Sequence, residues 1–211
     1  MYCIAGKNQC SLDALSYLIS RNDIDKRNLS VCTNSDDDGV DNWQPSLMKY
    51  ANDNDISILS LNDLYKIKNL YFFSLEFDKI IKTKKFLSKN LFNFHFSLLP
   101  KYRGCHTNYL QIRNGETKTG VTCHEIDDGI DTGRIIDRLI YQIDINDTSK
   151  DNYLKLMSSA SKLFINLFDL ILSGNYSSSE QKQSDASYFS RKSINYKEEK
   201  VNNEGDLITI H

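Results

Sequence analysis

The stretch Leu91–Gly104, LFNFHFSLLPKYRG, is the part of the chain that most sharply limits its fold. Apolar and polar residues alternate over its first six positions, which is the pattern of a strand with one buried face. On the other face, Asn93 and His95 are two residues apart, so their side chains project the same way, about 6.5–7 Å from each other. Pro100 follows shortly and breaks the strand, because proline cannot pair in a central ladder. We therefore predict that an amide and an imidazole stand together at a catalytic strand end.

Other apolar runs before and after this strand predict the rest of the sheet. Further strands are expected at Tyr2–Ala5, Leu29–Thr33, Ile56–Leu59, Leu70–Phe73, Gly120–Ile126 and Ile135–Gln142. Residues with helical spacing predict helices starting after an N-cap at Ser11, opening at Pro45, and covering Leu61–Ile67, Tyr109–Asn114 and Ser149–Leu172. This order predicts an α/β fold, a Rossmann-like mostly parallel sheet flanked by helices, with antiparallel pairing in its later part.

The composition changes after Gly174. NYSSSEQKQSDAS is polar with little to bury, and SYFSRKSINY alternates around a turn-like RKS. We therefore expect residues 1–174 to form the catalytic domain, and residues 175–211 to form a linker with a small C-terminal β-hairpin and tail.

The charge balance and the termini limit the partners. The chain has 211 residues with 26 basic and 28 acidic side chains, net charge −2, which argues against a surface-wide attraction to nucleic acid. The N-terminus lacks the pattern of a signal peptide. The longest apolar run, Leu163–Leu172, is too short to span a bilayer. We expect a cytoplasmic protein with no nucleic-acid or membrane partner.

The five cysteines do not form a recognisable pattern. Their number is odd, and no two have the spacing of a zinc site. We expect reduced structural thiols, no disulfide and no metal.

A second polar motif lies downstream, in the sequence DDGIDTG, which contains Asp131. Gly129 and Gly133 allow tight turns there and let a backbone approach a ligand closely. By itself the segment is equally compatible with an acidic hairpin turn.

Together, NFHFSLLPKYRG and TGVTCHEIDDGIDTG resemble the motifs of the formyltransferases that use 10-formyltetrahydrofolate. In that family the patterns are Asn-x-His-x-Ser-Leu-Leu-Pro, Gly-x-Thr-x-His and Asp-x-Gly-x-Asp-Thr-Gly. The resemblance covers residues 70–140 and implies the formyltransferase fold, 10-formyltetrahydrofolate as co-substrate, and Asn93, His95 and Asp131 as the catalytic trio. One departure is Phe96, where many members carry proline.

The reaction that the resemblance implies gives each member of the trio a role. An amine attacks the formyl carbon, and Asn93 and protonated His95 donate hydrogen bonds to the oxyanion of the tetrahedral intermediate. A histidine side chain can accept or donate a proton, so His95 would serve as base or acid. Asp131 holds the ring in one tautomer and stabilises its charged form, or relays a proton through water. The order of proton transfers stays open.

The folate would lie beside this trio. Apolar side chains that line a pterin slot, or else belong to the core, are Leu75, Phe77, Ile80, Leu98 and Leu99. The resemblance also implies backbone contacts from the segment after Phe73 and from Asp127, Asp128, Gly129 and Ile130. His124 is expected to be structural.

Three subfamilies compete for the acceptor. Glycinamide ribonucleotide formyltransferases have a glycine-rich first turn, whereas this chain has AGKNQCS. Methionyl-tRNA formyltransferases carry a further C-terminal barrel, which is not expected here. AGKN and KYRGCHTN resemble the enzymes that formylate nucleotide-linked amino sugars, which implies dTDP-4-amino-4,6-dideoxyglucose or its 3-amino isomer as acceptor, for O-antigen or other surface polysaccharide (lipopolysaccharide) synthesis.

Residues for the sugar nucleotide follow from position and chemistry. Lys7 and Asn8 lie where the first strand meets a helix, a natural site for the diphosphate. The other candidates are His106, Asn108, Tyr188 and Arg191. The aromatic hairpin equally suits a dimer surface, and we expect a homodimer. Ribonucleotide formylation, folate hydrolysis, and a non-enzymatic folate- or nucleotide-sugar-binding module remain as alternatives.

Overall fold

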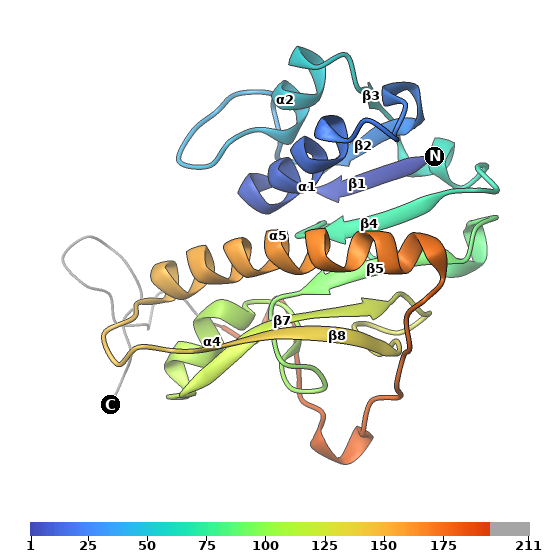
Figure 1. Ribbon diagram of the computed structural model, residues 1–211. Helices are drawn as coiled ribbons and strands as arrows, with labels where there is room; N and C mark the ends of the chain where they lie inside the picture. Colours follow the sequence, from blue (N-terminus) through green and yellow to red (C-terminus); the bar gives the residue numbers. More distant parts are fainter. Residues whose placement is uncertain (195–211) are drawn as a thin grey trace.

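The computed structural model describes residues 1–194 (Figure 1). Its main sheet has seven strands in the order β3-β2-β1-β4-β5-β7-β8. These strands are β1 (Tyr2–Gly6), β2 (Leu29–Thr33), β3 (Ser57–Ile58), β4 (Tyr71–Leu75), β5 (Asn90–His95), β7 (Lys118–Glu125) and β8 (Ile135–Gln142). The first five are parallel, and β7 and β8 are antiparallel. The predicted α/β class and the late antiparallel strands are therefore confirmed.

Helices cover both faces of the sheet. These are α1 (Asn8–Ser20), α2 (Leu47–Asp53), α3 (Leu61–Leu64), α4 (Thr107–Arg113) and α5 (Ser149–Ser173). Alternate residues of β1 belong to two hydrophobic clusters on opposite faces of the sheet. Ile4 packs with α1, α2 and α5, whereas Cys3 and Ala5 pack with α3 on the other face. Burial of apolar side chains on both faces is what a parallel central strand requires.

Helix α5 is long and apolar enough to cross a membrane by length and composition. In this structure the helix lies along one face of the sheet (Figure 1), and its Leu163, Phe164 and Phe168 are buried in the core shared with the strands. Its start and end follow the sequence closely, with a capping box between Thr148 and Asp151 and a left-handed Gly174 at its C-terminus.

The start of the first helix differs from the prediction. Lys7, not Ser11, is the N-cap, and Ser11 lies inside α1, where its hydroxyl donates to the carbonyl of Leu75 at 2.8 Å. Gly6 explains the early start, because a Cβ there would lie 1.8 Å from the same carbonyl. The glycine lets β1 and the end of β4 come together and turns the chain directly into the helix.

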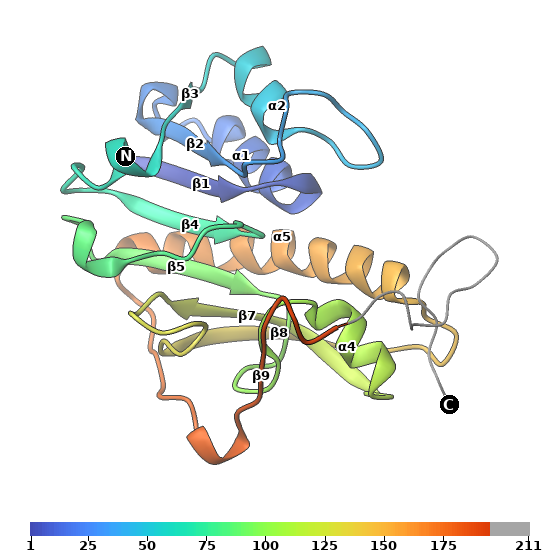
Figure 2. The ribbon, with the colours of Figure 1, turned by 180° about the vertical axis from the view of Figure 1, so that it is seen from behind.

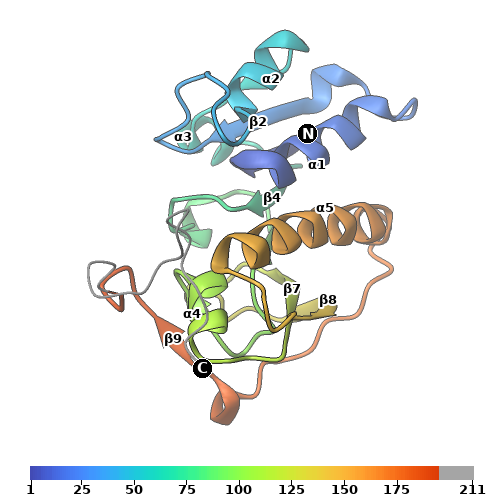
Figure 3. The same cartoon turned by 90° about the vertical axis from the view of Figure 1, so that its left-hand side faces the viewer.

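The segment after α5 returns to the site instead of leaving the domain. Ser179 pairs with Ile135, the first residue of β8. Strand β9 (Tyr188–Phe189) then pairs in parallel with β6 (Arg103–Gly104) in a second small sheet. Figures 2 and 3 show β9 beside α4, where Phe189 packs with Tyr102 and Tyr109. The second arm of the predicted C-terminal hairpin extends beyond the described residues.

Candidate active site

The sheet brings the three predicted catalytic residues together. Asn93 and His95 lie at the end of β5, and Asp131 lies in the connection between β7 and β8. The antiparallel register places Asn93 opposite His124 and His95 opposite Thr122. Strand β7 ends at Glu125, which lies opposite Phe92, the neighbour of Asn93. The loop that follows β7 therefore starts next to Asn93 and places Asp131 in contact with it.

Asp131 is the centre of the hydrogen-bond network. Its Oδ1 accepts from Asn93 Nδ2 at 3.2 Å, and its Oδ2 accepts from the Gly104 N–H at 2.8 Å. The Nδ1 atom of His95 lies 3.5 Å from the same Oδ2. Burial raises the pKa of Asp131, but the His95 and His124 rings and the Gly104 N–H outweigh it, so the pKa lies well below its usual value. Asp131 is therefore a carboxylate at neutral pH, and it stabilises positive charge on His95.

The tautomer of His95 follows from its second contact. Its Nε2 lies 2.7 Å from the carbonyl oxygen of Tyr102, which only accepts hydrogen bonds, so Nε2 carries the hydrogen. In the neutral ring Nδ1 then holds the lone pair, and this atom faces Asp131. Nδ1 is accordingly the ring nitrogen that can take up a proton, and a proton there would face the Asp131 carboxylate.

His124, which was expected to be structural, is also part of this network. Its Nε2 lies 3.1 Å from Asn93 Nδ2 and 3.5 Å from Asp131 Oδ1, while Nδ1 donates to the Glu125 carbonyl at 2.7 Å. Its alternation with Thr122 and Gly120 in Gly-x-Thr-x-His was a signal, because residues two apart share a face. Only the register with β5 places that face in the site.

The two N–H groups of Asn93 are both engaged, one with His124 and one with Asp131. The reversed amide would direct its oxygen at the Asp131 carboxylate, which is unfavourable. Donation to an oxyanion therefore requires one N–H to leave its present partner when substrate enters.

The trio opens into a cavity of about 950 Å³. Predicted folate residues that line it are Phe77, Ile80, Asp127, Gly129 and Ile130, and predicted sugar-nucleotide residues that line it are Lys7, His106, Asn108, Tyr188 and Arg191. Its size lies near the upper end for ligand pockets, and Phe77, Ile80 and Ile130 give part of its lining an apolar surface that suits a flat pterin. The residues present thus fit the implied folate co-substrate.

Four predicted folate residues do not line this cavity. Leu75 is fully buried in the core on the α1 side of the sheet. Leu99 is buried and its backbone bonds to Thr122 and Arg138, while Leu98 is half-buried outside the lining. Asp128 is exposed beside Lys84. For Leu75 and Leu99, the core interpretation holds in this structure.

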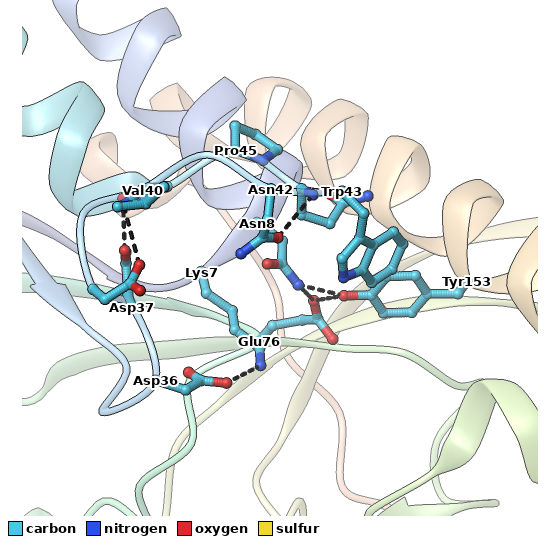
Figure 4. A pocket seen from close by; sticks show the side chains of 13 residues that line it. Lys7, Asn8, Asp36, Asp37, Val40, Asn42, Trp43, Pro45, Glu76 and Tyr153 are labelled. Carbon is cyan, nitrogen blue, oxygen red and sulfur yellow. Dashed lines mark hydrogen bonds and ion pairs between the residues drawn. The ribbon is translucent and has the colours of Figure 1, made fainter.

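A smaller cavity of about 250 Å³ adjoins the first (Figure 4). Lys7 and Glu76 line both cavities, and Asn8, Trp43 and Tyr153 line the smaller one. Lys7 Nζ pairs with Asp36 at 2.8 Å, so a diphosphate at Lys7 would share the ammonium with a carboxylate or displace it. Glu76, Trp43 and Tyr153 were not predicted as site residues from the sequence; the one available signal was that Glu76 directly follows a strand.

Four of the six non-glycine residues that adopt the left-handed conformation within residues 1–194 line these cavities, namely Asn8, Glu76, His106 and Asp131. The other two are Asp55 and Tyr102, and φ lies between 53° and 63° in all six. Each such conformation costs about 1–3 kcal/mol and persists only where the surroundings fix it. Gln181 helps to fix the backbone conformation of Asp131, because its amide donates to the carbonyls of Asp131 and Gly133, both at 2.8 Å.

Comparisons with known proteins agree with this geometry. The family model described as formyl transferase matches residues 75–167. The crystal structure of an N-formyltransferase from Helicobacter canadensis, in complex with folinic acid and dTDP-3-aminofucose, is 45% identical, with a TM-score of 0.91, covering 95% of this chain and 74% of that one. The structure of WlaRD, a sugar 3N-formyl transferase in the presence of dTDP and 5-N-formyl-THF, is also 45% identical, with a TM-score of 0.90, covering 92% of this chain and 71% of that one.

A curated relative extends the comparison to a larger protein. The bifunctional polymyxin resistance protein ArnA of Wigglesworthia glossinidia brevipalpis is 34% identical over 131 residues, which are 61% of this chain. The match spans 20% of that relative's length, so this chain corresponds to only a part of it.

Proposed function

The chain belongs to the formyltransferase family, and on this premise we propose that it transfers the formyl group of 10-formyltetrahydrofolate to the amino group of a dTDP-linked amino-dideoxysugar. The observation that carries the proposal is the network in which Asp131 contacts both Asn93 and His95 at the edge of a cavity large enough for two substrates. In this scheme Nδ1 of His95 takes a proton from the attacking amine, and Asp131 stabilises the imidazolium that forms. The imidazolium then gives this proton to N10 of the folate as the bond between N10 and the formyl carbon breaks, so His95 returns to its neutral form.

The position of the amine is the finer question. Sequence analysis favoured dTDP-4-amino-4,6-dideoxyglucose, with the 3-amino isomer as the alternative. Two similar solved structures, each 45% identical, support the 3-amino isomer, since one contains dTDP-3-aminofucose and the other is described as a 3N-formyl transferase. We therefore place a dTDP-3-amino-3,6-dideoxyhexose first. Cytoplasmic surface-polysaccharide synthesis by a homodimer is the setting that we propose for this activity.

Competing acceptors give the test. The protein is incubated with 10-formyltetrahydrofolate and one of four partners: a dTDP-3-amino sugar, a dTDP-4-amino sugar, glycinamide ribonucleotide, or no acceptor. We expect formyl transfer to the 3-amino sugar with the highest kcat/KM. Transfer to the ribonucleotide alone would refute the proposal, folate turnover without acceptor would indicate a hydrolase, and binding without turnover would indicate a binding module.

A further inference from the structure

Glu76 is a carboxylate that the catalytic trio does not use, and it lies at the junction of the two cavities. The pairs Ser74–Asn93 and Leu75–Phe94 join β4 to β5. Glu76 follows Leu75 as His95 follows Phe94, so the two residues leave neighbouring parallel strands at the same edge. This placement puts a second proton-accepting group on the cavity that His95 also lines.

One oxygen of Glu76 is fully occupied. Oε2 accepts from the hydroxyl of Tyr153 and from Asn8 Nδ2 at 3.2 Å, and Asn8 Nδ2 also lies 2.6 Å from the Tyr153 oxygen (Figure 4). The pKa of Tyr153 is raised far above its usual value by burial and by Glu76, so Tyr153 remains a donor. These two donors fix the rotation of the carboxylate.

The other oxygen, Oε1, has no hydrogen-bond partner within residues 1–194, and it is not sealed from the cavities. The backbone of Glu76 is held as well: its φ is 60°, and its carbonyl accepts from Asn34 Nδ2 at 2.9 Å. A strained, doubly anchored carboxylate with one open oxygen has the features of a preorganised acceptor for a substrate donor.

The surrounding charges set the affinity of Glu76 for a proton. Burial raises its pKa, the hydrogen bonds from Tyr153 and Asn8 and the charge of Lys7 oppose this, and Asp36 adds to it. The buried Cys10 thiol is also near, and burial keeps its pKa well above the usual value, so it stays neutral. Glu76 is therefore more basic than a surface glutamate.

The amine of the proposed acceptor has to lose a proton before it can react. An aliphatic amine is mostly an ammonium ion at neutral pH, and an ammonium has no lone pair with which to attack a formyl carbon. Some group has to remove this first proton, and His95 is then needed for the second proton, which is released when the C–N bond forms.

We propose, resting on the function stated above, that Oε1 of Glu76 binds the ammonium group of the acceptor and takes its first proton. The N–H bond breaks, an O–H bond forms on Glu76, and the nitrogen keeps the electron pair with which it attacks. Glu76 returns this proton to water after product leaves, so the carboxylate is regenerated without any further reactant.

The test compares Glu76→Gln with the unaltered protein over pH 6–9.5, measured as kcat/KM for the amino sugar. The variant retains an oxygen for Tyr153 but accepts no proton, so it depends on free amine, whose fraction falls about tenfold per pH unit below the amine pKa. We expect a loss of at least about tenfold at pH 7 that shrinks as the pH rises. Asp169→Asn, which alters an exposed carboxylate paired with Arg21 far along α5, is the matched control and should show no such slope.

A binding measurement separates contact with the amine from a general role. The probe is the dTDP-sugar with a hydroxyl in place of the amine; Glu76→Gln should bind it within about twofold of the unaltered protein. A pH-independent loss of kcat/KM, or equal weakening of the hydroxyl probe, would overturn the proposal. If the unaltered protein fails to formylate any amino sugar, the proposed function itself has failed, which is a distinguishable result.

Discussion

The Nδ1 atom of His95 lies 3.5 Å from Oδ2 of Asp131. Nε2 of the same ring donates to the Tyr102 carbonyl. In the proposed mechanism Nδ1 therefore exchanges the proton with the substrate, and Asp131 stabilises the charge on the ring. Asp131 in turn is held by the Gly104 N–H and by Asn93. The site is thus one connected network, whose members are expected to act together.

Removing the charge of Asp131 tests the centre of this network. Asp131→Asn leaves the imidazolium of His95 without its carboxylate, and turnover should fall at least about a hundredfold. Circular dichroism and formyl-transfer kinetics are the measurements. Asp137→Asn, an exposed carboxylate on the adjacent strand β8, should stay within about twofold. Near-normal turnover in the folded Asp131 variant would contradict the assignment.

His124 offers a test with two isosteric replacements. Asparagine retains a polar group near Nδ1 but loses the acceptor at Nε2, whereas glutamine can place its oxygen near Nε2. Because Nε2 contacts Asn93, we expect His124→Asn to lower kcat at least about tenfold with little change in KM, and His124→Gln to lower it less. Equal effects of the two variants would argue for a purely structural role.

Gln181 tests whether the returning C-terminal segment positions the catalytic loop. Its amide bonds to the carbonyls of Asp131 and Gly133, and its Oε1 accepts from Arg103. We expect Gln181→Ala to lower kcat about tenfold. Gln183→Ala, which loses a bond to Arg103 but none to the loop, is the matched control. If both variants lower kcat alike, the loop contacts are not what matters.

The raised pKa of Glu76 predicts an unusual pH dependence of stability. The folded protein binds the proton of Glu76 more tightly than the unfolded chain does. The contribution of Glu76 to the free energy of unfolding is therefore most favourable below the unfolded pKa, about 4.3. It is lost as the pH rises through the raised pKa of the folded protein. Glu76→Gln lacks this loss. In urea unfolding, the stability of Glu76→Gln relative to the unaltered protein should therefore increase from pH 4.5 to pH 8. A constant difference would show that the pKa is not raised.

The junction of β1, α1 and β4 predicts a strong effect at Gly6. A Cβ there would lie 1.8 Å from the Leu75 carbonyl and 2.5 Å from the Ser11 hydroxyl, so backbone would have to shift. Gly6→Ala should cost at least about 3 kcal/mol of unfolding free energy, measured with urea. Gly115→Ala meets no atom within 4 Å and should cost only the left-handed conformation, about 1–2 kcal/mol.

The order of apolar strands and helical spacers was legible in the sequence, because each strand buries a short run and each helix shows its own period. Strand β8 has the predicted bounds, and α5 extends the predicted range by one residue. The first helix starts earlier than predicted, because the close approach of Gly6 to Leu75 is a contact between distant segments. Such contacts leave no local pattern in the sequence.

For the site, the sequence by itself determined the chemistry: an amide and an imidazole two residues apart on one strand, and an aspartate in a glycine-containing loop. Only the tertiary structure decided which groups surround them. The register of β7 on β5 brings in His124, the left-handed turn after β4 directs Glu76 toward both cavities, and the chain after α5 folds back so that Gln181 holds the loop of Asp131. Local alternation fixes the face on which a side chain lies, whereas pairing between distant segments fixes its neighbours, and catalysis depends on those neighbours.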